Sequence, residues 1–283
     1  MAKQLLGKEV TAAINETIKA NVAKLSEKGI TPTLGIIRVG EREDDISYER
    51  GALKRCETLG VSCEKFVLPA DVSEEELLKV IDEVNHNDAI HGVLLFRPLP
   101  KHLNEEKIIN ALDIAKDVDG ITDGSLAGVF AGKPLGFPPC TPKACMEILD
   151  FYGIDCTGKK AVVVGRSLVV GKPAAMMLLK KNATVTVCHT RTNDMPSVVR
   201  EADIVIVAAG KAKVVDGSYL RAGQIVIDVG INVNEDGKLC GDVHYEEAEQ
   251  IVDAITPVPG GVGSVTTSVL VGHVVEAAMR NYL

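Results

Sequence analysis

The stretch Lys160-Ala-Val-Val-Val-Gly-Arg-Ser-Leu-Val-Val-Gly-Lys-Pro-Ala174 decides the fold class of this chain. Its apolar run 161–164 predicts a buried parallel strand, because such strands lose their alternation when both faces are covered. Gly165 allows a tight turn, and Gly171 opens an apolar, methionine-rich helix. A strand, a glycine turn and a helix amino terminus present backbone N–H groups to a phosphate. The spacing is not G-x-G-x-x-G, so the loop alone leaves a plain strand–helix turn as open as a dinucleotide site.

Composition narrows the class of protein. The chain has 283 residues, of which 46% are apolar and 25% charged, and its net charge is -8. This balance is typical of a soluble globular protein and argues against a nucleic-acid or membrane-surface partner. We find no signal peptide and no apolar run long enough to span a bilayer, so we expect a cytoplasmic protein. The seven scattered cysteines contain no C-x-x-C pair, which favours reduced thiols and no metal site.

The first half of the chain alternates helical and strand patterns. The apolar periodicity changes between helix and strand from one segment to the next. Ser73-Glu-Glu-Glu76 has the form of a capping box. Such alternation calls for a mostly parallel sheet covered on both faces. The predicted helices are 10–25, 47–59, 73–85 and 104–112, and the predicted strands are 33–39, 62–68 and 90–96.

The passage 116–141 is rich in glycine and proline, and we expect it to hold a functional loop and the domain boundary. A helix should follow from Thr141, with Thr141 as N-cap and Pro142 at the first helical position. The rest predicts a Rossmann-like, doubly wound domain. The predicted domains are 1–140, completed by a final helix 266–283 that returns to it, and 141–265. The predicted elements of the second domain are strands 159–165, 183–189, 203–209 and 224–229, and helices 141–152, 170–180 and 195–201.

The end of the second strand of a dinucleotide domain indicates which cofactor it prefers. NAD enzymes carry a carboxylate there, but this chain reads His189-Thr-Arg-Thr192. Arg166, Thr190 and Arg191 suit a 2′-phosphate, which favours NADP over NAD. Either arginine alone is better explained as a solvated surface residue. Further on, Ile231 follows a strand and a glycine, where it could cover the nicotinamide or belong to an ordinary turn.

Three segments together resemble the methylenetetrahydrofolate dehydrogenase/cyclohydrolase family. They are Lys116-Asp-Val-Asp-Gly120, the turn from Gly165 to Pro173, and Thr256-Pro-Val-Pro-Gly-Gly-Val-Gly263. Their order and intervals fit, and the resemblance covers essentially the whole chain. It implies a two-domain α/β fold with a cleft that holds the folate against NADP.

The resemblance also implies a reaction. Members oxidise 5,10-methylenetetrahydrofolate to the methenyl form by hydride transfer, and bifunctional members hydrolyse that product to 10-formyltetrahydrofolate. Homodimers formed through the nucleotide domain are usual. Catalytic roles fall to Tyr48, which packs on the folate, and Asp119, which anchors the pterin. The substrate positions are Tyr48, Ala52, Phe96, Asp119, Pro259, Gly260, Gly261 and Thr266, and the cofactor positions are Gly165, Arg166, Ser167, Gly171, Thr190, Arg191 and Ile231.

The chain departs from the family pattern at two paired positions. The family carries Tyr-x-x-x-Lys, and its lysine is the main cyclohydrolase residue, but here Ala52 stands at that place. The glutamine that partners this lysine is replaced by Phe96. Because hydride transfer depends on positioning two rings rather than on a lysine, we predict a dehydrogenase with weak or absent cyclohydrolase activity.

Arg55 and Arg97 are the cations that could stand near the missing lysine. Helical spacing puts Arg50 and Lys54 about 200° away from Ala52. An arginine is always charged, so it cannot act as a general base near neutral pH. Three alternatives stay open. They are a fully bifunctional enzyme in which Arg55 or a water substitutes, a non-catalytic folate- or NADP-binding regulator, and an amino-acid or malate-type NADP dehydrogenase of the same layered fold. The last has little support, because no Lys/Asp pair typical of such a site stands in motif context.

Overall fold

The computed structural model describes residues 1–282 and separates into two compact units. The three-stranded unit comprises 13–140 and 267–282, and the six-stranded unit comprises 1–12 and 141–266. The predicted boundaries placed the first twelve residues in the first domain. They group instead with the six-stranded unit, where β1 (Lys3–Gln4) pairs with β11 (Ala254–Ile255).

The three-stranded unit is built on a parallel sheet in the order β3-β2-β4. Its strands are β2 (Thr33–Val39), β3 (Ser62–Leu68) and β4 (Gly92–Leu95). Neighbouring residues of β3 point to opposite faces of the sheet and pack against different helices. Lys65 reaches Glu49 of α2 (Glu43–Leu59), whereas Phe66 packs in the core cluster that contains Leu77 of α3 (Glu74–His86). Both faces of this sheet are therefore covered, as the alternating pattern predicted.

Local sequence signals explain where several helices of this unit begin. The Ser73 hydroxyl accepts from the Glu76 N–H, and the Glu76 carboxylate accepts from the Ser73 N–H, so the predicted capping box is confirmed. The side chains of Asn104 and Thr122 cap two further helices by accepting from the Lys107 and Ser125 N–H groups. The remaining helices that contribute to this unit are α1 (Gly7–Ser26), α4 (Glu105–Ile109), α5 (Asp123–Ala131) and the later part of α10 (Val262–Tyr282).

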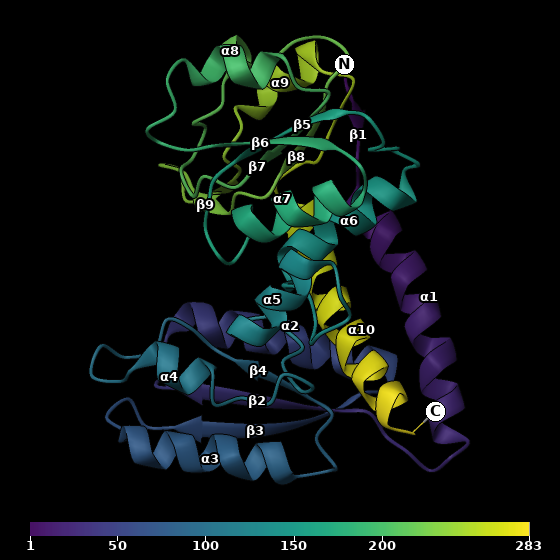
Figure 1. The fold of residues 1–283 in the computed structure, drawn as a ribbon, viewed down its shortest axis with the longest axis vertical. Helices are drawn as coiled ribbons and strands as arrows, with labels where there is room; N and C mark the ends of the chain where they lie inside the picture. The colour runs from purple at the N-terminus through teal and green to yellow at the C-terminus, as the bar shows by residue number, and fades with distance from the viewer. Residues whose placement is uncertain (283) are drawn as a thin grey trace. The chain divides into compact units, whose positions relative to one another are not determined.

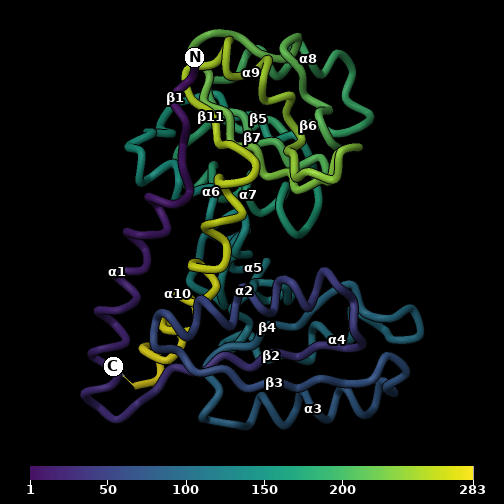
Figure 2. The backbone as a smooth tube through the Cα atoms, turned by 180° about the vertical axis from the view of Figure 1, so that it is seen from behind, coloured from purple at the N-terminus to yellow at the C-terminus, as the bar shows by residue number. Residues whose placement is uncertain are grey.

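The six-stranded unit holds a sheet in the order β1-β11-β8-β7-β5-β6, in which every neighbouring pair is parallel. Helices α6 and α7 cover one face, and α8 and α9 cover the other (Figures 1 and 2). The chain reverses its direction of travel across the sheet between β5 and β7, the switch point at which such folds bind ligands. The elements are β5 (Lys160–Val164), β6 (Thr184–Cys188), β7 (Ile204–Val207), β8 (Ile225–Asp228), α6 (Cys140–Phe151), α7 (Gly171–Lys180), α8 (Met195–Arg200) and α9 (Tyr245–Ile251).

The structure corrects the prediction mainly at helix starts. Helix α2 begins at Glu43, inside the predicted polar loop, because acidic residues in a first turn are stabilised by the helix dipole. Helix α6 begins at Cys140, so Thr141 is not its N-cap. Helix α10 begins at Val262 rather than Thr266, since Val262 and Val265 are buried. The prediction also missed α5, α9, the 3₁₀ turn Gly217–Tyr219 and the short strands β1, β9 (Asn232–Val233), β10 (Leu239–Cys240) and β11.

Helix α10 also differs from the expectation about apolar runs. By length and composition it could cross a membrane, although no such run was expected. However, 67% of its most apolar window is buried inside the protein, which is the pattern of a core helix.

Candidate functional site

Helix α2 presents Tyr48 and Ala52 one turn apart. Its buried residues form a single stripe, and it ends cleanly because Gly60 adopts φ +74° and its N–H bonds the Cys56 and Glu57 carbonyls. Within the stripe, Glu49 forms a buried ion pair with Arg38 of β2 at 2.8 Å. Removal of either partner would leave an uncompensated buried charge, so this pair fixes the rotation of the helix beside the sheet.

Phe96 follows β4 and packs against Tyr48. The two ring centroids lie 5.9 Å apart at an interplanar angle of 83°, an edge-to-face contact. Phe96 is 8% exposed and Ala52 is fully buried. At the two positions where the resemblance places a lysine and a glutamine, the structure therefore has buried apolar side chains.

The 116–120 segment runs alongside β4 and presents Asp119. The Val93 N–H donates to the Lys116 carbonyl at 2.7 Å. Asp117 is fully buried and accepts from the Ile121 N–H, the Thr122 N–H and hydroxyl, and the Ser125 hydroxyl. Of the two aspartates in this motif, Asp117 therefore organises the loop, and Asp119 accepts none of these four hydrogen bonds.

Asp119 has an unusual ionisation. Burial raises the pKa of its carboxyl to about 6, assisted by the Asp117 charge and opposed by a hydrogen bond from the Cys140 thiol and by the Arg97 charge. The Asp119 carboxyl is therefore mostly ionised at neutral pH, but its pKa lies only about one pH unit lower. A partly desolvated carboxylate is well suited to accept a bidentate pair of N–H groups.

Cys140 and Tyr48 complete the surroundings of Asp119. Burial, together with the Asp119 charge, raises the pKa of both the Tyr48 hydroxyl and the Cys140 thiol well above their usual values. The Cys140 sulfur lies 3.3 Å from the Val118 carbonyl and 3.8 Å from His273 Nδ1. Both Tyr48 and Cys140 are consequently protonated near neutral pH, which leaves Asp119 as the group among these three that titrates there.

Cys140 and His273 were not predicted as site residues. Cys140 begins α6 and His273 lies in α10, far apart in sequence. The sequence offered no signal for either, because a cysteine after two prolines and a histidine in an apolar helix are ordinary core residues. Lys116, in the same motif as Asp119, serves the fold: its ammonium donates to the Val84 and Asn87 carbonyls at the end of α3.

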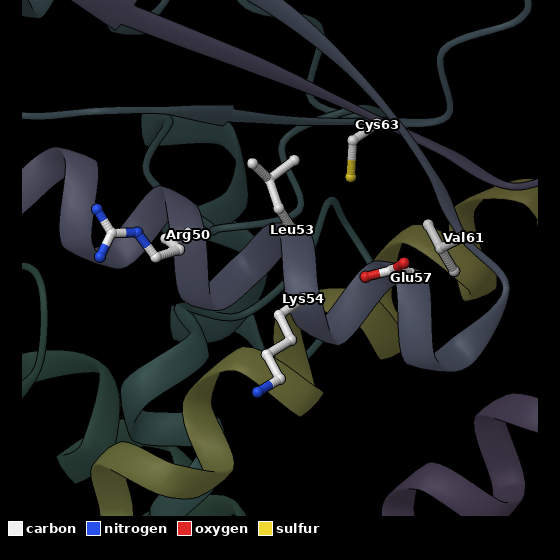
Figure 3. Close-up of a pocket in the computed structure, with 6 residues that line it drawn as sticks. All are labelled: Arg50, Leu53, Lys54, Glu57, Val61 and Cys63. Atoms are coloured by element: carbon white, nitrogen blue, oxygen red, sulfur yellow. The ribbon is translucent and has the colours of Figure 1, made fainter.

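The cations on the exposed side of α2 do not replace the missing lysine. Arg50 and Lys54 line an open surface groove together with Leu53, Glu57 and others, as Figure 3 shows. Ala52 is fully buried, whereas Arg50 and Lys54 are exposed. The two cations therefore face away from the Ala52 side, as helical spacing predicted.

In the six-stranded unit, the predicted phosphate turn connects β5 to α7. Gly165 has φ +126°, and a Cβ there would collide with the Ala208 carbonyl oxygen. A Cβ at Gly171 would collide with the Gly165 carbonyl oxygen, so the two glycines bring the start and end of the turn together. The Ser167 hydroxyl accepts from the Val170 N–H at 3.1 Å. Only glycine fits both positions, which explains the unusual spacing.

The residues predicted to read a 2′-phosphate lie at one edge of the sheet. The Gly165 N–H donates to the Cys188 carbonyl, so strands β5 and β6 end next to each other at the same edge of the sheet. Arg166, Thr190 and Arg191 follow directly, and all three are exposed. His189 stabilises the turn after β6, because its Nδ1 accepts a hydrogen bond from the Arg191 N–H at 3.1 Å. Two guanidinium groups and a hydroxyl beside a glycine turn fit a phosphorylated dinucleotide.

Ile231 lies in a loop held by two buried aspartates. Its side chain is 68% exposed. Asp228 accepts from the Gly230, Asp242 and Val243 N–H groups, and burial raises the pKa of the Asp228 carboxyl to about 6. Asp242 in turn accepts from the N–H groups of residues 209–211 and from the Asn232 amide. The loop that bears Ile231 is thus fixed by hydrogen bonds, although its most apolar side chain is open to solvent.

The third motif packs on the start of α1. The Gly7 N–H donates to the Gly260 carbonyl, and Gly260 has φ +102°. Gly261 is buried, while Pro259 is exposed. The Thr266 hydroxyl donates to the Val262 carbonyl within α10 at 3.3 Å. These residues belong to the six-stranded unit, whereas Tyr48, Ala52, Phe96 and Asp119 belong to the three-stranded unit.

Among residues 1–282, the structure has no group of three or more His, Cys, Asp or Glu side chains that could hold a metal ion.

Two family models match the chain, one over each half. The catalytic domain of the tetrahydrofolate dehydrogenase/cyclohydrolase family matches residues 5–119, and the NAD(P)-binding domain of the same family matches residues 139–282. Together the two matches cover most of the sequence.

Individual relatives agree with the family match. The chain is 57% identical over 279 residues to the bifunctional protein FolD of Carboxydothermus hydrogenoformans, covering 98% of this chain and 97% of that protein. The crystal structure of the bifunctional FolD of Campylobacter jejuni superposes with a TM-score of 0.97 at 40% identity, covering 99% of this chain and 100% of the other. The FolD of Trypanosoma brucei, solved with NADP and an inhibitor, gives a TM-score of 0.93 at 34% identity and covers 99% and 98%.

Proposed function

The chain belongs to the tetrahydrofolate dehydrogenase/cyclohydrolase family, and from this premise we propose that it oxidises 5,10-methylenetetrahydrofolate to methenyltetrahydrofolate. NADP supplies the chemistry by accepting the hydride when it is bound. The observation that carries the proposal is the desolvated Asp119 carboxyl beside the Tyr48 and Phe96 rings. An acceptor for paired N–H groups next to an aromatic surface is what a flat pterin requires.

The residues of the three-stranded unit would bind and orient the substrate. Asp119, ionised above pH 6, accepts hydrogen bonds from the pterin ring. Tyr48 is held edge-on by Phe96 and offers a ring surface for packing. Neither residue has to take up a proton from the carbon that loses the hydride. Their contribution is therefore positioning, which can account for a large part of a rate enhancement in a transfer between two bound rings.

The six-stranded unit supports NADP rather than NAD. Arg166, Thr190 and Arg191 lie exposed at the carboxyl edge of β5 and β6, and none is a carboxylate that would repel a 2′-phosphate. The Trypanosoma brucei relative was solved with NADP. Guanidinium groups bind phosphate through paired, charge-assisted hydrogen bonds, which a ribose hydroxyl cannot match.

We further propose that cyclohydrolase activity is weak or absent. Hydrolysis of the methenyl product needs a group that manages protons on the attacking water. The lysine position is filled by the fully buried Ala52 and the glutamine position by Phe96, which packs on Tyr48. Tyr48 and Cys140 stay protonated near neutral pH. The Arg97 charge acts on Asp119, but a guanidinium is always protonated and so cannot serve as a general base.

The second candidate is a fully bifunctional enzyme. It is favoured by the names of the relatives, since the Carboxydothermus hydrogenoformans and Campylobacter jejuni proteins are both called bifunctional. In that case Arg55, or a water held beside Asp119, would have to substitute for the lysine.

One assay separates these candidates. Protein, methylenetetrahydrofolate and NADP are mixed, and the absorbance of the methenyl product is followed. We expect the product to form and then to decay only at its spontaneous rate. Decay well above that rate would show the bifunctional enzyme, and no product at all would favour a non-catalytic regulator. Equal rates with NAD in place of NADP would discredit the roles given to Arg166 and Arg191.

A gain-of-function variant sharpens the test. The double variant Ala52→Lys/Phe96→Gln restores the family pair, and we expect hydrolysis of added methenyltetrahydrofolate to rise above that of the unaltered protein. The single variant Phe96→Leu is the control, because it opens the same space without a polar group. If the unaltered protein already hydrolyses methenyltetrahydrofolate as fast as the double variant, the proposal that it lacks cyclohydrolase activity is wrong.

A homodimer formed through the six-stranded unit and a cytoplasmic location stay predictions. Sedimentation of the purified protein tests the first, and fractionation of the source cells tests the second.

A further inference from the structure

Two cysteines of the three-stranded unit face each other across α2 and β3. Strand β3 runs parallel to β2, so the helix that connects them runs in the opposite direction. Lys65 of β3 contacts Glu49 of α2 at 3.5 Å. Cys63 lies two residues before Lys65, on the same face of the strand. Cys56 lies two turns after Glu49, in the same buried stripe of the helix. The Lys65–Glu49 contact therefore sets Cys56 opposite Cys63.

The two thiols differ in their access to solvent. Both are free cysteines, and Cys56 is fully buried whereas Cys63 is partly exposed. Cys63 lines the open groove on α2, and Figure 3 shows its sulfur directed toward the helix between Leu53 and Val61. A small molecule can therefore reach Cys63 from the groove, but it cannot reach Cys56 directly.

A hydrogen bond joins the two thiols. The hydrogen bond between the two sulfurs lowers the pKa of Cys63, and the same bond, together with burial, raises the pKa of Cys56. Because the thiolate is the nucleophile in disulfide exchange, the accessible sulfur is also the more reactive one. The groove carries Arg50 and Lys54 and one carboxylate, Glu57, so its lining favours an anionic reagent.

We propose that Cys56 and Cys63 form a reactive dithiol, in which Cys63 attacks and Cys56 resolves, and that it reacts with small anionic disulfides such as glutathione disulfide. The proposal concerns thiol chemistry alone and does not rest on the proposed dehydrogenase activity.

The reaction balances in two exchange steps. The Cys63 thiolate attacks one sulfur of glutathione disulfide, forms a mixed disulfide and releases one glutathione thiolate. Cys56 then loses its proton and attacks the Cys63 sulfur, which forms the Cys56–Cys63 bond and releases the second glutathione. The protein loses two hydrogen atoms, and the oxidant is reduced to two glutathione thiols.

The other cysteines provide internal controls. Cys140, Cys145, Cys156 and Cys188 are buried, and burial raises the pKa of each thiol. Cys240, in β10, is partly exposed like Cys63 but belongs to the six-stranded unit. If exposure alone decided reactivity, Cys240 would react as fast as Cys63.

The test uses the full-length protein incubated with glutathione disulfide at neutral pH, followed by intact-mass and peptide analysis. We expect the unaltered protein to lose two hydrogen atoms and to yield a cross-linked 56/63 peptide that dithiothreitol releases. Cys56→Ala should instead retain one glutathione on Cys63. Cys63→Ser should leave Cys56 unmodified, and Cys240→Ser should behave like the unaltered protein.

Three results would overturn the proposal. They are a stable glutathione adduct on Cys63 of the unaltered protein, modification of Cys240 ahead of Cys63, or reaction of Cys56 in the Cys63→Ser variant. Circular dichroism of each variant establishes that it is folded. Because Cys63 is partly exposed, Cys63→Ser keeps the test decisive even if the substitution at buried Cys56 disturbs the fold.

Discussion

The two units hold their candidate site residues in opposite ways. In the three-stranded unit Ala52 and Phe96 are buried, and burial shifts the pKa of Asp119 and Tyr48. In the six-stranded unit Arg166, Thr190 and Arg191 are exposed on a backbone that glycines and buried aspartates fix. The first site depends on desolvated side chains, and the second depends on a rigid backbone that carries solvated ones. Substitutions should therefore alter chemistry in the first unit, and either stability or simple affinity in the second.

The largest effect is expected from the backbone of the six-stranded unit. Gly165→Ala should lower the free energy of unfolding by about 4 kcal/mol, because it combines a strained φ with a collision against the Ala208 carbonyl. Urea unfolding measures the change. Gly153→Ala is the control, since Gly153 has φ +67° but open space around it. Equal losses in both variants would show that strain alone, and not the contact, matters.

Asp119→Asn should have the next largest effect, now on activity. We expect kcat/KM for methylenetetrahydrofolate to fall about 100-fold, as two charge-assisted hydrogen bonds of about 1.5 kcal/mol each are weakened. The dissociation constant of NADP, measured by fluorescence titration, should stay the same. A comparable loss of NADP affinity would mean that the two sites are not separable as proposed.

Arg166→Ala should affect only the cofactor. The KM for NADP should rise about tenfold, the value of one charge-assisted contact of about 1.4 kcal/mol, with no change in the KM for NAD. Steady-state kinetics with both cofactors measures this difference. Lys159→Ala removes another exposed cation of the same unit and should change neither value. A rise in both KM values after the arginine is removed would contradict a 2′-phosphate contact.

The smallest effect is a pH dependence. The pKa of the Asp119 carboxyl is raised to about 6, so its ionised form is complete only above that pH. If the carboxylate binds the pterin, kcat/KM should be constant above pH 7, about half its plateau at pH 6, and fall about tenfold per unit below. Asp119→Asn should remove this limb from the profile. A profile that is flat to pH 5 would assign Asp119 a structural role.

Sequence patterns predicted the layered architecture because strong periodicity and glycine punctuation recur along the whole chain. The Ser73 capping box and the strand 33–39 were predicted residue by residue. Helix starts were less predictable. Glu43–Asp45 looked like a polar loop because helix propensity is weak and tertiary packing decides whether such a turn forms. Helix α5 was missed for the same reason: its glycines favour a loop, yet Gly128 is needed where a Cβ would meet Leu135.

The candidate site was predictable only where a motif carried it. Motif spacing singled out Gly165 and Arg166, and the resemblance singled out Asp119. Apart from the resemblance, no local pattern distinguished Asp119 from Asp117, since their difference lies in the Thr122 and Ser125 partners that surround Asp117. Cys140 and His273 were unpredictable in a stronger sense. Their sulfur and Nδ1 lie 3.8 Å apart only in the folded chain, because the two residues are 133 positions apart in the sequence.

The hydrogen bonds of the Asp242 carboxylate have a consequence for the association rate of the cofactor. It already binds the N–H groups of residues 209–211, next to the Ala208 carbonyl that Gly165 packs against. The protein alone has thus already lost the conformational entropy of this turn, so a nucleotide would meet a surface that needs no ordering. Association should then be set by diffusion and by the exposed Arg166 and Arg191, and should slow as ionic strength rises. Differences in affinity between related dinucleotides should be found mainly in how fast they leave.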